Sequence, residues 1–272
     1  MRTCFNSVTA GRHQPIEDII AACGLVGFEA VEIDEAHIRT FVEHRPIEEL
    51  EAIIEKAGLK VASVMPFDLA PFDETGLPFS RIKRGADDSK NLHAPVLLTY
   101  CAAMVPEEMT LETAREKAAD RAREYADAVA PLCIALEPIG RTTVMHGPRA
   151  ALDIANRAGR DNVGIIMDSF HYYRSEITKE EILSIPADKL LLVHLNDSED
   201  KPRAELRDSH RLHVGRGILP LPEYLECLEE IGFQGFCSVE IFREEYWKEP
   251  VIDVVKEAKR TLDSALAAAG IH

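Results

Sequence analysis

The sequence predicts an α/β protein that folds as a single (β/α)8 barrel over residues 1–272. Eight short apolar runs alternate with longer amphipathic stretches. The runs show little alternation of apolar and polar residues, which is typical of parallel strands covered on both faces. Each strand-and-helix unit averages roughly 34 residues, as an eight-unit barrel of this length requires. No low-complexity linker divides the chain, so we expect one domain.

The expected strands are runs of four to six residues, at 3–8, 30–33, 60–65, 95–100, 132–137, 163–168, 190–195 and 237–241. Apolar residues at helical spacing predict helices within 15–28, 46–59, 110–130, 221–233 and 251–270. Several helix-like stretches are followed by a glycine, where a left-handed helix cap is expected: Gly58, Gly159, Gly232 and Gly270. A doubly wound open sheet is the alternative fold, but no GxGxxG motif follows the first strand.

Composition excludes several classes of protein. The formal net charge is −16 and no basic stripe is present, which argues against a nucleic-acid partner. No apolar run reaches 18 residues, so we expect no membrane span. The first residues lack the long apolar core of a signal peptide, which favours a cytoplasmic protein. The six cysteines are scattered without a CxxC motif, and we expect most of them to be buried and reduced.

Four consecutive strands late in the chain carry a polar residue at or near the carboxyl end. These residues are Glu137, Asp168, His194 and Glu240, separated by 31, 26 and 46 residues. A lone acid at a strand end is usually a turn or helix-cap residue. Because the carboxyl ends of barrel strands meet at one face, we expect all four side chains to point into one mouth.

Such a cluster is costly without a cation. Two carboxylates about 4 Å apart repel by about 4 kcal/mol at an effective dielectric near 20. A divalent ion about 2.2 Å from each oxygen attracts each one by roughly 15 kcal/mol on the same scale. The sequence therefore predicts one divalent metal ion. Three carboxylates with one imidazole suit Mn²⁺ first, and Mg²⁺, Zn²⁺ or Co²⁺ are compatible.

Two further residues are predicted to contact the substrate. His171 follows the Asp168 strand by three residues, and Arg211 lies in the loop after the seventh strand. Either side chain can hydrogen-bond a substrate oxygen that carries developing negative charge. In the same loop, Gly215 and Gly217 with nearby arginines could form a phosphate nest.

Acidic residues elsewhere are interpreted as solvated helix faces. This interpretation covers the acid-rich segment 17–35 and the run 48–51.

Six motifs together resemble the sugar isomerase/epimerase superfamily, the xylose isomerase-like TIM barrels. By that resemblance Glu137, Asp168, His194 and Glu240 match metal ligands, and His171 and Arg211 match substrate-contacting positions. The motifs are CFN (4–6), LEPIG (136–140), RDNVGIIMDSFH (160–171), HLNDSED (194–200), RLHVGRG (211–217) and SVEIFREEYW (238–247).

The resemblance implies a metal-dependent isomerase or epimerase of a polyhydroxy ketone, either a keto-inositol or a ketose, in inositol or carbohydrate metabolism. Glu137 and Glu240 would move the proton through a cis-enediolate. One alternative is a metal-dependent dehydratase of the inosose or 3-dehydroshikimate type, and another is a non-catalytic sugar-binding barrel. A DNA-repair phosphodiesterase is disfavoured by the negative charge. The sequence leaves open whether the substrate is phosphorylated and whether the chain forms a homo-oligomer.

Overall fold

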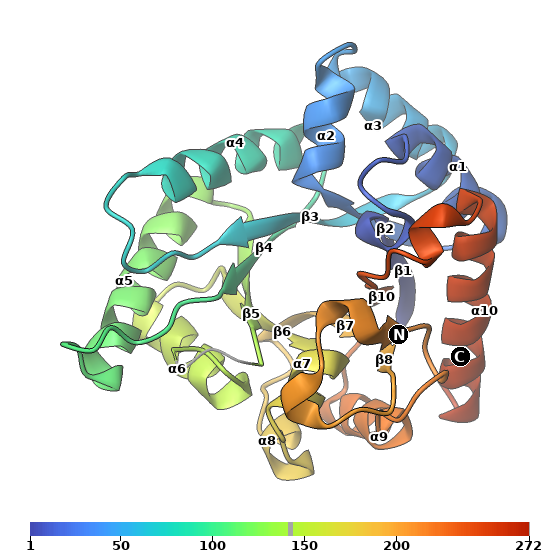
Figure 1. Cartoon of the computed structure of the whole chain (residues 1–272). Coiled ribbons are helices and arrows are strands. Elements are labelled where there is room, and N and C mark those ends of the chain that lie inside the picture. The colour runs from blue at the N-terminus through green and yellow to red at the C-terminus, as the bar shows by residue number, and fades with distance from the viewer. Residues whose placement is uncertain (141–143, 272) are drawn as a thin grey trace.

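The computed structural model describes residues 1–140 and 144–271 and shows a closed barrel of eight parallel strands surrounded by helices (Figure 1). The predicted (β/α)8 barrel is therefore confirmed. β10 closes the barrel by pairing with both β1 and β7. The strands are β1 (Arg2–Asn6), β2 (Ala30–Asp34), β3 (Lys60–Asp68), β4 (Val96–Cys101), β5 (Cys133–Pro138), β6 (Val163–Asp168), β7 (Leu190–Leu195) and β10 (Phe236–Val239).

The helices join these strands in the alternation that the sequence predicted. The four predicted cap glycines have positive φ angles, from 63° at Gly159 to 80° at Gly232. No helix in the described ranges is both long enough and apolar enough to cross a membrane. The helices are α1 (Ile16–Val26), α2 (Glu35–Val42), α3 (Ile47–Lys56), α4 (Leu77–Asn91), α5 (Leu111–Val129), α6 (Pro148–Ala158), α7 (Ser169–Arg174), α8 (Lys179–Leu183), α9 (Leu221–Ile231) and α10 (Val251–Ala268).

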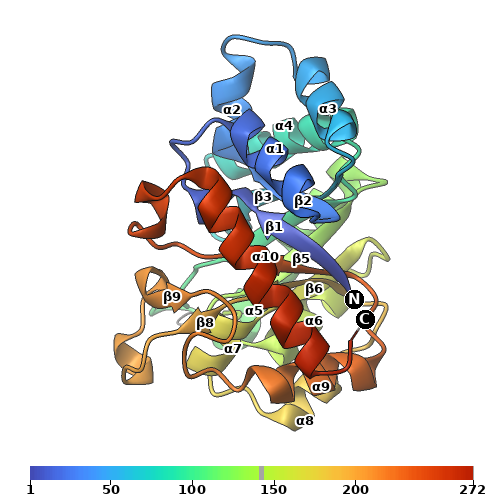
Figure 2. The ribbon, with the colours of Figure 1, turned by 90° about the vertical axis from the view of Figure 1, so that its right-hand side faces the viewer.

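A small antiparallel ribbon follows β7. It pairs β8 (Asp197–Ser198) with β9 (Arg211–Leu212). Figure 2 shows this ribbon at one end of the barrel and the two chain termini close together at the other. The ribbon therefore lies at the carboxyl end of the strands, where it brings Arg211 beside the barrel mouth.

The barrel has two apolar cores. The larger core lies between the strands and the helices. The smaller core fills the barrel interior and includes Cys4, Ala30, Ala135, Ile166 and Leu192. Side chains along a strand alternate between the two faces, so the residue two positions further on also points inward. Each of these five strands therefore carries a second inward position nearer the mouth.

The first and last predicted strands differ from the structure at their ends. The predicted strand 3–8 ends at Asn6, because the Asn6 side chain accepts the Val8 N–H at 3.1 Å and starts a 3-10 helix, Ser7–Ala10. The predicted strand 237–241 ends at Val239, so Glu240 is the residue directly after the strand. All six cysteines are free, and Cys133 is the one that is not fully buried.

Candidate metal centre

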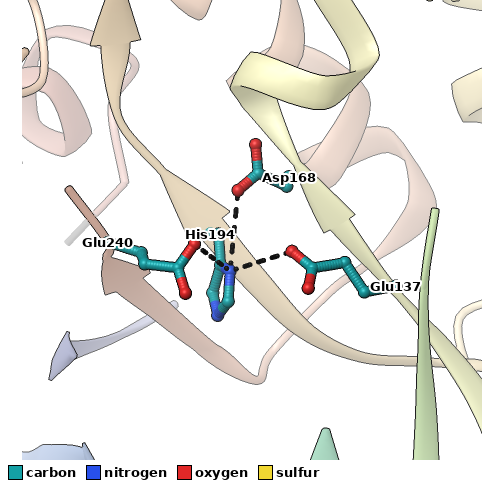
Figure 3. Close-up of side chains that lie close together, drawn as sticks. All are labelled: Glu137, Asp168, His194 and Glu240. Atoms are coloured by element: carbon teal, nitrogen blue, oxygen red, sulfur yellow. Dashed lines mark ion pairs between the residues drawn. The ribbon is translucent and has the colours of Figure 1, made fainter. Parts of the chain in front are cut away.

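The four predicted donors converge at the barrel mouth. Glu137 is in β5, Asp168 ends β6, His194 is in β7, and Glu240 follows β10. One ligand atom from each of the four residues lies within 4.8 Å of the others, and all four residues are buried. Figure 3 shows the three carboxylates arranged around the imidazole. Each donor is two residues beyond an inward-facing residue of its strand, so strand alternation places it in the barrel.

His194 presents one ring nitrogen to the three carboxylates. Its Nδ1 lies 3.2 Å from Glu240 Oε2, 3.5 Å from Glu137 Oε1 and 3.6 Å from Asp168 Oδ2. This nitrogen is buried and makes no hydrogen bond within the described part of the chain. A buried nitrogen without a hydrogen bond, surrounded by three carboxylate oxygens, is the donor set that a divalent cation requires.

Asp168 has two roles: it caps a helix and it faces the candidate metal site. These are the two roles that the sequence indicated for an acid at the end of a strand. Its Oδ1 accepts the His171 N–H at 3.0 Å and caps α7. Its Oδ2 faces the His194 ring and lies 2.7 Å from Arg211 Nη1. The helix cap therefore fixes the carboxylate while its second oxygen remains available to a cation.

The electrostatics of the cluster favour a positive charge at its centre. Burial alone would lower the pKa of His194, but the carboxylates of Glu240 and Glu32 raise it well above its ordinary value. Burial raises the pKa of Glu240, with partial compensation from His194 and Arg211. Burial would also raise the pKa of Asp168, yet Arg211 and the neighbouring imidazoles hold it well below its usual range. A divalent cation would replace the proton that this acidic cage otherwise holds on His194.

Glu32 is a site residue that the sequence interpretation missed. Its Oε1 lies 3.0 Å from His194 Nε2, and its Oε2 accepts the Ser63 hydroxyl at 2.5 Å. A carboxylate on the far nitrogen fixes the tautomer and orientation of a metal-binding histidine. Asn6 Nδ2 lies 3.2 Å from Glu240 Oε1 and 3.5 Å from Glu32 Oε1, so it links the two acids.

The interpretation of segment 17–35 as a solvated helix face is wrong at its C-terminal end. Glu32, Asp34 and Glu35 are at most 4% exposed. Glu32 is in β2, two residues after the interior residue Ala30, which was the signal that could have identified it. In contrast, Asp18, Glu48 and Glu49 are exposed as expected.

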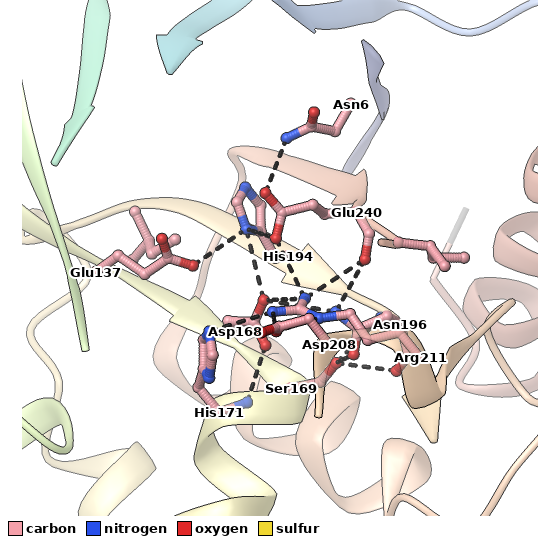
Figure 4. Close-up of polar contacts among 12 residues, drawn as sticks. Asn6, Glu137, Asp168, Ser169, His171, His194, Asn196, Asp208, Arg211 and Glu240 are labelled. Carbon is pink, nitrogen blue, oxygen red and sulfur yellow. Dashed lines mark hydrogen bonds and ion pairs between the residues drawn. The ribbon is translucent and has the colours of Figure 1, made fainter. Parts of the chain in front are cut away.

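Arg211 and His171 lie together against the candidate donors (Figure 4). Arg211 is 1% exposed; its Nη1 contacts Asp168 and lies 3.2 Å from Glu240 Oε2, and its Nη2 lies 3.1 Å from His171 Nε2. Asp208 accepts from Arg211 Nη2 at 3.0 Å. A guanidinium that is held by several partners is already positioned to stabilise charge on a bound oxygen.

The phosphate nest that the sequence left open at Gly215 and Gly217 is not formed. The Gly217 N–H donates to Asp197 Oδ2 at 2.8 Å, and a Cβ at Gly217 would lie 2.0 Å from the Ser198 carbonyl oxygen. The carboxylate of Asp197 occupies the place that an anion would take.

A cavity of about 360 Å³ opens over the cluster. Its lining includes both candidate bases and both predicted substrate contacts: Glu137, His171, Arg211 and Glu240. Met65, Pro66, Tyr100 and Phe242 add apolar and aromatic walls. A polar floor with apolar walls is typical of a small-molecule site.

The chain therefore belongs to the class of eight-stranded parallel barrels with a candidate metal site at the carboxyl face. In this chain the site consists of three acids and one imidazole. The family model described as xylose isomerase-like TIM barrel matches residues 20–265, and the chain belongs to this family.

One curated relative and one solved structure match nearly the whole chain, and a second curated relative matches more than half of it. An inosose isomerase of Bacillus velezensis is 28% identical over 277 residues, covering 98% of each chain. An inosose isomerase of Bacillus subtilis is 33% identical over 158 residues, covering 57% of each. The crystal structure of the IolI protein with a bound zinc atom has a TM-score of 0.93 and 25% identity, covering 99% of each chain.

Proposed function

We propose that this protein is a metal-dependent isomerase of a keto-inositol, with inosose as the first substrate to test and ketoses as the second group. The observation that carries the proposal is the buried Nδ1 of His194, faced by the carboxylates of Glu137, Asp168 and Glu240. The similarity to inosose isomerases over 98% of the chain supports the choice of substrate.

We propose Glu137, Asp168, His194 and Glu240 as the metal ligands and Mn²⁺ as the ion. Three carboxylates with one imidazole favour a hard or borderline divalent cation, and zinc is the ion bound in the IolI structure. A bound divalent cation would supply Lewis acidity that polarises the substrate carbonyl. Elemental analysis of the purified protein, followed by activity with each metal added back, identifies the ion.

Glu137 and Glu240 are the proposed proton carriers. They lie on opposite sides of the His194 ring in Figure 3 and both line the cavity. One carboxylate takes the proton from the carbon next to the substrate carbonyl, and the electron pair moves to the carbonyl oxygen to give an enediolate. The hydroxyl proton on that carbon then passes to the former carbonyl oxygen and a proton returns to the former carbonyl carbon, so the carbonyl moves by one carbon and the formula is unchanged. Two carboxylates on opposite sides allow the proton to return to either face.

Arg211 and His171 are proposed to hold the negative oxygen of the enediolate. Arg211 is buried and anchored by Asp168 and Asp208, so it needs little reorganisation when charge develops. His171 lies beside it and lines the same cavity. The two side chains thus line the same cavity as both proposed bases.

Turnover in D₂O tests the proposal. Inosose, a ketose panel and their products are followed by mass spectrometry and NMR with the Mn²⁺ form. An isomerase places deuterium next to the carbonyl and returns material of unchanged formula apart from the label. A product lighter by one water identifies the dehydratase alternative, and neither label nor product with metal fully loaded leaves a sugar-binding barrel.

Matched glutamate variants assign the bases. Glu137→Gln and Glu240→Gln should each block exchange or confine it to one face of the substrate. Glu257→Gln, on the outer helix α10, is the control and should exchange normally. Full exchange in both site variants would remove the two glutamates from the mechanism.

We further propose that residues 1–272 act as one cytoplasmic domain. The pairing of β1 with β10 supports the single domain, because the first and last strands complete one barrel. The buried free cysteines are consistent with a reducing compartment. Limited proteolysis and fractionation of the source cells test these two statements.

A further inference from the structure

An arginine-rich hollow lies beside the barrel mouth, outside the candidate metal centre. Its volume is about 530 Å³, and its lining includes Arg12, Arg39, Arg81 and Arg84. It lies between α2 and α4, which are neighbours at the top of Figure 1. In a chain with a net charge of −16, four arginines line this one hollow together with the two acids Asp34 and Glu35.

The hollow adjoins the cavity over the metal centre. Arg12 and Pro66 line both spaces. Arg12 therefore forms part of the wall between the candidate metal centre and the hollow. One elongated ligand can occupy both spaces only by passing this wall.

The fold fixes the arginines through buried acids at the end of β2. Glu35 is 4% exposed and accepts from Arg81 at 2.6 Å and from Arg84 at 2.7 Å. Asp34 accepts from Arg12 Nε at 2.7 Å. Arg39 pairs with Asp88 on α4. Each guanidinium is thus anchored through one nitrogen to a carboxylate.

The anchored arginines keep further donors for a ligand. The side chains of Arg12, Arg81 and Arg84 are 50–51% exposed although each is held by an acid. A guanidinium carries five N–H donors, so one carboxylate contact leaves several of them unused. Anchoring also reduces the side-chain entropy that binding would otherwise cost.

The position of α4 is set by close packing. A Cβ at Gly85 would lie 2.1 Å from the Phe67 ring, so this helix approaches β3 as only glycine allows. Arg81 and Arg84 are three residues apart and therefore lie on the same face of α4. The close approach holds both guanidinium groups at the rim of the mouth.

We propose that this hollow binds a phosphate group. Planar guanidinium forks pair with phosphate oxygens in two-point contacts, and a tetrahedral dianion can accept from several forks at once. The first source that we propose is the phosphate ester of a ketose or cyclitol whose carbonyl lies over the metal centre, a statement that rests on the proposed function. The second source is free phosphate acting as a regulator, which needs no turnover.

Equilibrium binding tests the site without any reaction. Inorganic phosphate is titrated into the metal-loaded protein by calorimetry, with binding followed in parallel by ³¹P NMR. Arg12→Gln and Arg84→Gln should weaken binding by about tenfold or more, because each removes charged hydrogen bonds. Arg160→Gln is the matched control, since Arg160 is 41% exposed and paired with Asp127 outside the hollow. Arg84→Lys keeps a positive charge beside Glu35 and should still weaken binding.

The outcomes decide the proposal. Binding that weakens in the hollow variants and persists in Arg160→Gln supports the site. No binding, or equal binding in all variants with unchanged thermal melts, overturns it. If Arg84→Gln alone is unstable, Arg84→Lys and Arg12→Gln still give the decision.

Kinetics then separate the two sources. A ketose and its phosphate ester are compared in wild type and Arg84→Gln. A kcat/KM preference for the ester of about tenfold or more that is lost in the variant, with competitive inhibition by phosphate, supports the substrate source. An effect of phosphate on the unphosphorylated substrate without competition supports the regulator. If no substrate turns over while phosphate still binds, the proposed function fails and the phosphate site stands.

Discussion

The two halves of the barrel contribute differently to the mouth. The second half, from β5 to β10, supplies all four candidate metal donors. The first half supplies side chains that hold those donors: Glu32 from β2 contacts His194, and Asn6 from β1 contacts Glu240. The comparison teaches that the donors come from the second half of the chain, and that closure of the barrel brings orienting groups from the first half beside them.

The charge of the candidate metal centre in the second half also differs from the charge of the hollow between α2 and α4 in the first half. The candidate centre combines three carboxylates with Arg211, whereas the hollow between α2 and α4 combines four arginines with buried acids. One mouth therefore presents an acidic centre suited to a cation and a basic hollow suited to an anion. The predictions below test this division, beginning with the largest expected effect.

Removing a donor of the second half should abolish the centre. Asp168→Ala and His194→Ala, or chelation of wild type, should remove the metal and lower kcat by about 10³-fold or more, because Lewis-acid stabilisation of several kcal/mol is lost. Elemental analysis and turnover measure both effects. His213→Ala is the control, since His213 is buried but stacks on Tyr246 away from the cluster. A fully active protein without metal would refute the assignment of a metal centre to the second half of the barrel.

Removing the residues that we propose to hold the enediolate should lower turnover while the metal remains. Arg211→Ala and His171→Ala should each reduce kcat by about 10² to 10³ with near-normal metal content, as expected for the loss of a donor to a developing oxyanion. Parallel metal analysis and steady-state kinetics separate the two effects. Metal loss equal to that of His194→Ala would instead place these residues among the ligands.

Removing the orienting acid of the first half should have a smaller effect. Glu32→Gln should weaken metal binding by about 10- to 100-fold, because His194 loses the carboxylate on its Nε2. Competition with a fluorescent chelator measures the affinity. Glu29→Gln, three residues earlier and outside the mouth, should bind metal normally. If Glu32→Gln loses the metal as completely as His194→Ala, the first half must itself supply a ligand.

The smallest effect should be seen as a pH dependence of metal affinity. The acids around His194 raise its pKa well above the ordinary value, so the metal-free protein carries an imidazolium there at neutral pH. Metal binding must displace that proton, and affinity should rise by up to about tenfold per pH unit until the raised pKa is reached. Calorimetry in buffers of different ionisation enthalpy counts the proton. Glu32→Gln should lower the pKa of His194 and reduce the number of protons released when the metal binds. Unchanged proton release in that variant would show that Glu32 does not raise the pKa of His194.

Most of the barrel could be predicted from the sequence because its strands are local features. Runs such as 163–168 and 190–195 are apolar except for Asp168 and His194, and both match the observed strand bounds. Strand ends were less predictable where a side chain intervenes, as Asn6 does when it starts a 3-10 helix. The helix α4 was not predicted, since its sequence is largely polar and its place depends on Gly85 packing against Phe67.

The same distinction applies to the candidate site. Glu137, Asp168, His194 and Glu240 were predicted to converge because parallel barrel strands end at one face, and the structure brings them together. Glu32 was assigned to a solvated face, because an acid in an acid-rich segment is usually exposed. Its partner His194 is 162 residues away in the chain, and no local pattern connects the two.

The sequence by itself determined the barrel, the four converging donors and the residues beside them, because strand alternation and a common carboxyl face follow from local order. Tertiary structure alone decided that Glu32 faces His194, that Asp197 fills the Gly217 loop, and that four arginines from separate segments surround one hollow. The physical reason is that these contacts form only when the barrel closes. Only when β10 pairs with β1 do side chains from the first strands reach those from the last, and only that contact sets their burial and charge.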